Sequence, residues 1–228
     1  MLSRLVLILA TAALLFGCNG AGGNSSQAAG GGDAVATFAL DTFQSNLFKV
    51  ARSFTATATD GADTYTLFFS IAPATDALFE GAIRKRAVLS FTIRKNGVTI
   101  SATNGDYFYQ ANPWQNFGMK FSSGPYAVAT TLHPALPNNA TVGSTGSLGV
   151  ITHYTNSRRR IVALRQESTW TLEEDTANTA FFCENAVIRN TSGAVVTTGS
   201  SCSRIDTSGN IIGIRFTIAV NDLMLTFQ

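Results

Sequence analysis

The feature that most constrains this fold is an alternation of apolar and polar residues with a period of two. Every second residue from Ile212 to Val220 is a large apolar one, and glycine, arginine, threonine and alanine stand between them. Successive side chains of a strand point to opposite faces, so the pattern predicts a strand with one buried face. The same spacing recurs in 65–71, 89–93 and 223–227. Most of this chain is therefore expected to be strand.

Turn residues between these runs favour antiparallel hairpins. Asn96 and Gly97 separate two strand-like runs, and this dipeptide is the strongest short-range signal for a hairpin. The stretches 190–193 and 206–209 are nearly the same turn, each with an acceptor side chain first and glycine last. The sequence thus predicts an all-β fold, with antiparallel meander sheets that form a sandwich or an open half-barrel.

One segment has helical spacing instead. Apolar residues recur every three or four positions from Leu40 to Phe54, which predicts a short helix around 42–51. Asp41 and Gln44 have the spacing of a capping box at its start. The domain as a whole is expected to span 34–228, a length that can bury a single core.

The Pro- and Asn-rich stretch 133–140 offers an alternative division of that domain into two lobes. Each lobe alone would be small and would leave sheet edges exposed, so one domain is the favoured prediction.

The amino end has the composition of an exported protein. An uncharged apolar run from Leu5 to Phe16 follows Arg4. This run has the length of a signal-peptide core and is shorter than the roughly 20 residues of a membrane span. The segment 19–33 is rich in Gly, Ser and Ala, which is typical of a flexible tether.

The segment 15–18, Leu-Phe-Gly-Cys, resembles the lipobox of bacterial lipoproteins. Leu15, Gly17 and Cys18 match that motif, whereas Phe16 departs from its usual small or β-branched residue. The resemblance implies that 1–17 is a removed signal peptide and that Cys18 carries acyl chains such as palmitate, which anchor 18–33 as a tether. Asparagine after the cysteine implies the outer membrane, facing the periplasm or the surface. An ordinary secretory signal and an uncleaved anchor are the alternatives.

The stretch 136–146, followed by a β meander, is also similar to uncharacterised all-β envelope lipoproteins. That similarity covers the second half of the chain and implies no activity.

Two other cysteines, Cys183 and Cys202, flank the turn at 190–193. If Asn190 pairs with Val195 to close that hairpin, the two cysteines lie directly opposite each other on one face. Such a pair is close enough for a disulfide, which an oxidising envelope preserves. The prediction is a Cys183–Cys202 disulfide, and two free buried thiols are the alternative.

Motifs for catalysis or metal binding do not occur in the sequence. There is no G-x-S-x-G, P-loop, H-E-x-x-H, C-x-x-C or EF-hand pattern. His133 and His153, the two histidines, have no ligand-type residue at metal spacing. No catalytic residue, cofactor or metal is expected, although a spatial Ser/His/Asp triad remains an alternative.

An aromatic group is the one candidate for a contact surface. Tyr107, Tyr109, Trp114 and Phe117 surround a Pro-containing loop, an arrangement that can bind a sugar or a peptide. The alternative is that these rings fill the core.

Charge excludes one class of partner. The net charge of +2 is too small for a nucleic-acid footprint. The expected function is that of an envelope lipoprotein with a non-catalytic binding or structural domain. Its partners would be the membrane, through the lipid anchor, and an envelope protein or glycan. A carrier of lipids or hydrophobic ligands, with an open apolar concavity, and a secreted hydrolase are the alternatives.

Overall fold

The computed structural model describes residues 36–220 and 223–228, which form one helix and fourteen strands. The helix is α2 (Leu40–Leu47). The strands are β1 (Thr37–Ala39), β2 (Arg52–Asp60), β3 (Asp63–Phe79), β4 (Ala82–Lys95), β5 (Val98–Ala111), β6 (Trp114–Phe121), β7 (Tyr126–Thr131), β8 (Asn139–Thr141), β9 (Thr145–Tyr154), β10 (Val162–Thr176), β11 (Thr179–Arg189), β12 (Val195–Asp206), β13 (Ile211–Val220) and β14 (Leu223–Phe227). No helix in this part of the chain has the length and apolarity to cross a membrane.

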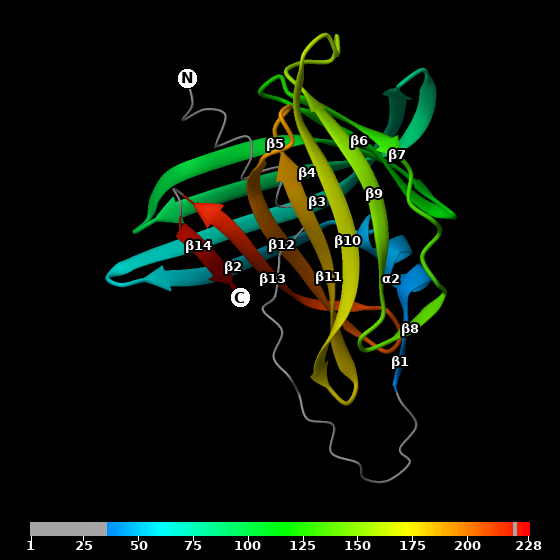
Figure 1. Cartoon of the computed structure of the whole chain (residues 1–228). Coiled ribbons are helices and arrows are strands. Elements are labelled where there is room, and N and C mark those ends of the chain that lie inside the picture. Colours follow the sequence, from blue (N-terminus) through cyan, green and yellow to red (C-terminus); the bar gives the residue numbers. More distant parts are fainter. Residues whose placement is uncertain (1–35, 221–222) are drawn as a thin grey trace.

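Twelve of the described strands form one antiparallel sheet, in meander order from β2 to β14. Strand β8 is left out of this sheet and pairs with β1 in a small second sheet. The large sheet curls so that β9–β12 cross over β2–β5 (Figure 1). At the seam, Thr57 and Gln228 exchange two backbone hydrogen bonds of 3.3 Å. The result is a nearly closed half-barrel, which confirms the predicted all-β meander.

The segment 132–138 connects β7 with β8, and β7 pairs directly with β9. Strands from before and after this segment therefore belong to one continuous sheet.

The hairpin between β4 and β5 has the predicted two-residue turn. Lys95 pairs with Val98, and Asn96 and Gly97 both adopt positive φ values, 48° and 83°. A turn with two positive φ values matches the right-handed twist of the strands it connects, and Asn-Gly tolerates it at the lowest cost.

The two similar turns at 190–193 and 206–209 also have the same hydrogen bonds. The amide of Gly193 donates to the carbonyl of Asn190, and that of Gly209 donates to the carbonyl of Asp206, each at 3.0 Å. In both turns the first side chain accepts hydrogen bonds from two later backbone amides. The prediction of one turn used twice is therefore confirmed.

The helix forms where the apolar spacing predicts one, but it begins at Leu40 and ends at Leu47 rather than spanning 42–51. The predicted capping box is wrong, because no side chain caps α2 and Gln44 is buried. Backbone carbonyls take over this role. The amide of Ala39 donates to Thr207 at 3.1 Å, and the amide of Leu40 donates to Asn138 at 2.9 Å.

Helix α2 lies inside the half-barrel and completes its core (Figure 1). Leu40 and Phe43 are fully buried, and the Phe43 ring lies 4.8 Å from that of Phe182 on β11. Just after the helix, Phe48 stacks on Tyr109 of β5 at 4.5 Å. Each such side chain contributes about 1.5–3 kcal/mol through burial. The helix thus fills the concave face of the sheet.

Candidate functional site

The four aromatic residues expected at a contact surface do not form one. Tyr107, Tyr109 and Trp114 are at most 7% exposed and belong to the core. Phe117 lies on the opposite, outer face, where the Arg84 guanidinium covers its ring at 3.6 Å. Alternate residues of β5 and β6 face the interior, and the interior is the face that α2 covers.

A cleft of about 510 Å³ opens where α2 enters the half-barrel. We call it the mouth cleft. Its walls are α2, the connection between β5 and β6, and the loop 135–138. Gln44 contributes to one wall and Trp114 to another. The Asn112–Pro113 peptide bond beside Trp114 is cis.

Two residues that line this cleft, Gln44 and Trp114, carry buried polar atoms without partners, and two residues next to Trp114 carry more. In the described part of the chain, both amide atoms of Gln44, Nε1 of Trp114, Oδ1 of Asn116 and Nε2 of His133 are buried and make no hydrogen bond. Asn116 lies two residues from Trp114 on the same face of β6, and the His133 ring stacks on Trp114 at 4.8 Å. Buried polar groups in proteins are nearly always bonded, and each orphan costs about 1–3 kcal/mol. Such a group of atoms can form hydrogen bonds with the polar atoms of a ligand.

His133 acts as an acceptor in this group. Its Nδ1 lies 2.6 Å from the carbonyl oxygen of Pro134. Because a carbonyl only accepts, Nδ1 donates, and Nε2 of the neutral ring keeps a free lone pair. Burial lowers the pKa of His133, which favours this neutral form.

The cleft and its immediate surroundings therefore contain unbonded donors and acceptors without buried charge. Among the lining residues, Trp114 has an N–H and Gln44 has both kinds of atom, and Asn116 and His133 next to Trp114 have acceptors. The charged residues Asp41 and Lys49 line only the exposed rim. This arrangement matches a neutral, hydroxyl-bearing molecule better than an ion.

A second, smaller hollow of about 40 Å³ lies between the end of α2 and strands β2, β3, β5 and β11–β13. We call it the inner chamber. Its size suffices for a few water molecules and not for an acyl chain. In this structure α2 thus fills the concavity that a lipid carrier would need open.

Glu184 on β11 lines the inner chamber and is partly exposed. Burial raises the pKa of Glu184 to about 8, and the Gln44 amide opposes part of this shift. That amide lies close to the carboxyl group but makes no hydrogen bond of normal geometry. Burial also raises the pKa of Tyr107, and the negative charge of Glu184 adds to the shift. Sequence periodicity alone gave no sign of this interior acid.

The second histidine has only neutral partners. Nε2 of His153 lies 2.9 Å from Oε1 of Gln166, whose Nε2 donates to Ser168 at 3.1 Å. Burial lowers the pKa of His153 to about 4. Neither His133 nor His153 hydrogen-bonds a hydroxyl or carboxylate in the described residues. Nothing in this part of the chain indicates catalytic activity.

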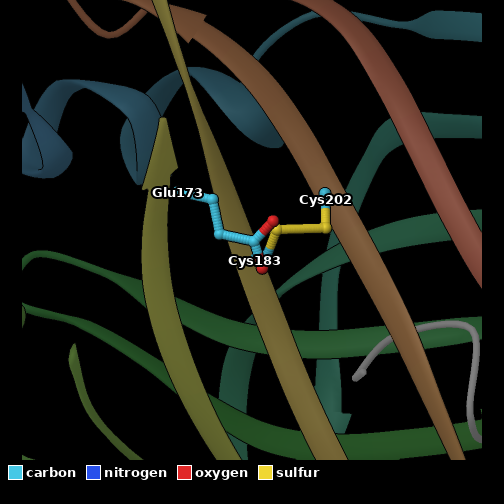
Figure 2. A group of neighbouring side chains, drawn as sticks. All are labelled: Glu173, Cys183 and Cys202. Carbon is cyan, nitrogen blue, oxygen red and sulfur yellow. A yellow bond between two sulfur atoms is a disulfide. The ribbon is translucent and has the colours of Figure 1, made fainter. Parts of the chain in front are cut away.

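Cys183 and Cys202 form the predicted disulfide between β11 and β12, with Cα atoms 4.0 Å apart (Figure 2). Nη2 of Arg215 lies 3.5 and 3.4 Å from the two sulfur atoms and also donates to Glu173. The Glu173 carboxylate lies beside the bond in Figure 2. Both sulfur atoms belong to the disulfide, so Glu173, Cys183 and Cys202 together provide no thiolate ligand for a metal.

No family model, curated protein or solved structure matches this chain. The predicted lipidation site, Cys18, lies outside the described residues.

Proposed function

We propose that this protein is a non-catalytic binding protein of the cell envelope, held at the outer membrane by lipid on Cys18. Its ligand would be a small neutral molecule with several hydroxyl groups, such as a sugar unit of an envelope glycan. The mouth cleft would bind this ligand.

One observation carries the proposal. Two side chains that line the mouth cleft, Gln44 and Trp114, carry buried polar atoms without partners, and Asn116 and His133, which lie next to Trp114, carry two more. A hydroxyl-bearing ligand would satisfy donors and acceptors together, which recovers the free energy that these orphan atoms cost. The lipobox resemblance and the tether-like composition of 18–33 support the anchored location.

Calorimetric titration with glucose, galactose, N-acetylglucosamine and their disaccharides tests the ligand class. We expect the wild-type protein to bind at least one sugar of this panel. Trp114→Phe keeps an aromatic ring but removes the N–H, and should weaken that binding about tenfold, the equivalent of one lost hydrogen bond.

The matched control is Trp170→Phe, which alters the other tryptophan, in the core away from the cleft. It should leave sugar affinity unchanged. Failure of the wild type to bind any sugar of the panel, or equal weakening by both variants, contradicts the proposed ligand class.

The anchor is tested separately, by mass spectrometry of the mature protein from membranes. An acylated amino-terminal Cys18 is expected, and Cys18→Ala should leave the membrane fraction. An unmodified amino terminus at another residue contradicts the anchoring.

A further inference from the structure

The inner chamber combines one acid with a wall of aromatic rings. Besides Glu184, its lining includes the rings of Phe48, Phe54, Phe69, Tyr107 and Phe216. Phe48 stacks on Tyr107 at 4.9 Å, and Phe69 meets Phe216 edge-on at 5.4 Å. These rings come from the segment after α2 and from β2, β3, β5 and β13, so aromatic side chains of several elements line the same chamber as the acid.

The charge of Glu184 has no counter-charge in this chamber. None of the described residues that line it is basic. The groups that face the carboxyl group are the Gln44 amide on α2, Tyr107 on β5 and Ser201 on β12, its cross-strand neighbour. Loss of solvent without a counter-charge disfavours the ionised form, in agreement with the raised pKa of Glu184.

We propose that the inner chamber is a binding site for a small organic ammonium group, with the Glu184 carboxylate as its counter-ion and the aromatic rings as its walls. Ring faces carry negative electrostatic potential and attract cations, most strongly where water is excluded. The chamber shares no lining residue with the mouth cleft, so this site goes beyond the proposed function.

The size of the chamber limits the group that it accepts. About 40 Å³ holds an ammonium or methylammonium ion. A quaternary ammonium group would fit only if Leu47 and Phe48, at the end of α2, moved outward. Affinity is therefore expected to decrease from methylammonium to tetramethylammonium.

Binding must release the proton from Glu184. The affinity for methylammonium should rise about tenfold per pH unit below neutrality and level off above about pH 8. An alkylamine keeps its charge across this range, as a lysine side chain does. The probe is methylammonium chloride, titrated into the whole protein in phosphate buffer and followed by calorimetry and by the carboxyl ¹³C signal of Glu184.

Glu184→Gln keeps the shape of the side chain and should abolish both the binding and its pH dependence. Glu173→Gln, on the outer face, is the matched control and should bind as the wild type does. Trp114→Phe should also retain methylammonium binding, which separates this site from the mouth cleft.

Three results would overturn the proposal: no binding of methylammonium to the wild type at about pH 9, equal competition by potassium chloride, or unchanged binding by Glu184→Gln. The carboxyl ¹³C signal keeps the test decisive even if Glu184→Gln does not fold. A Glu184 pKa that methylammonium does not lower assigns this acid a purely structural role.

Discussion

At the scale of single residues, Gly209 shows how the sheet holds its helix. This glycine has a φ of +79°, and a Cβ atom there would lie 2.3 Å from the carbonyl oxygen of Ala39 and 2.8 Å from the amide of Phe43. The turn after β12 therefore packs directly against the start of α2. Gly193 occupies the same place in the matching turn, with φ +85° and no atom within 4 Å of a Cβ.

The two glycines form a matched pair for measurement. Gly193→Ala should cost about 1–2 kcal/mol, the usual cost of a left-handed backbone for alanine. Gly209→Ala has the same backbone cost and must also displace α2, so we expect the free energy of unfolding to decrease by about 3 kcal/mol or more. Urea unfolding monitored by circular dichroism measures both. Equal losses would mean that α2 does not depend on this contact.

The sequence predicts individual buried side chains unevenly. Phe216 and Ile218 follow from alternation alone, and both are buried. Gln44 and Glu184 also face the interior, yet their polarity predicts exposure. Their positions depend on α2 lying against β11, a contact between segments far apart in the chain that no local pattern encodes.

At the scale of elements, the hairpin of β11 and β12 shows which parts of strand pairing can be predicted from the sequence positions around a turn. Cys183 pairs with Cys202 as predicted. The loop differs, because the amide of Asn190 donates to Ala194 and Arg189 pairs with Val195. A register shift between Ile188 and Arg189 compensates for this tighter loop. The alignment of the cysteines was predictable, whereas the position of the bulge depends on turn geometry.

Loss of this disulfide should destabilise the protein. Closing a ring of this size contributes about 3 kcal/mol in the chain-entropy description. We expect the urea midpoint to decrease when the protein is unfolded and refolded with reductant. The double variant Cys183→Ala/Cys202→Ala should unfold at the lower midpoint with or without reductant. Identical midpoints for oxidised and reduced wild type would contradict this expectation.

At the scale of the whole molecule, two buried groups with opposite shifts define a pH optimum for stability. Burial raises the pKa of Glu184 from 4.5 to about 8 and lowers the pKa of His153 from 6.5 to about 4. The folded state holds a proton on Glu184 that the unfolded state releases above pH 4.5, so stability decreases as pH rises toward 8. The unfolded state gains a proton on His153 below pH 6.5, so stability decreases as pH falls toward 4.

The slopes from Glu184 and His153 cancel between about pH 4.5 and 6.5, and the lowered pKa of His133 adds a further decrease toward acid, so we expect the highest free energy of unfolding near the upper end of that window. Outside that window each group contributes a slope of up to about 1.4 kcal/mol per pH unit. Urea midpoints across this range, in amine-free buffer, measure the profile. Glu184→Gln should remove the alkaline decrease and leave the acid side intact. An alkaline decrease that persists in this variant would assign it to another group.

The meander order of the sheet has a consequence for how the chain folds. Each strand of the large sheet pairs with the next one along the chain, except that β7 skips β8 to reach β9. Such neighbours meet across short loops and early in folding. The contacts between Ala39 and Thr207 and between Thr57 and Gln228 join distant segments. We therefore expect the helix and the seam to dock last, after Cys183 and Cys202 have met in their local hairpin. Oxidation would then act on an open, trough-shaped intermediate, before the interior is sealed.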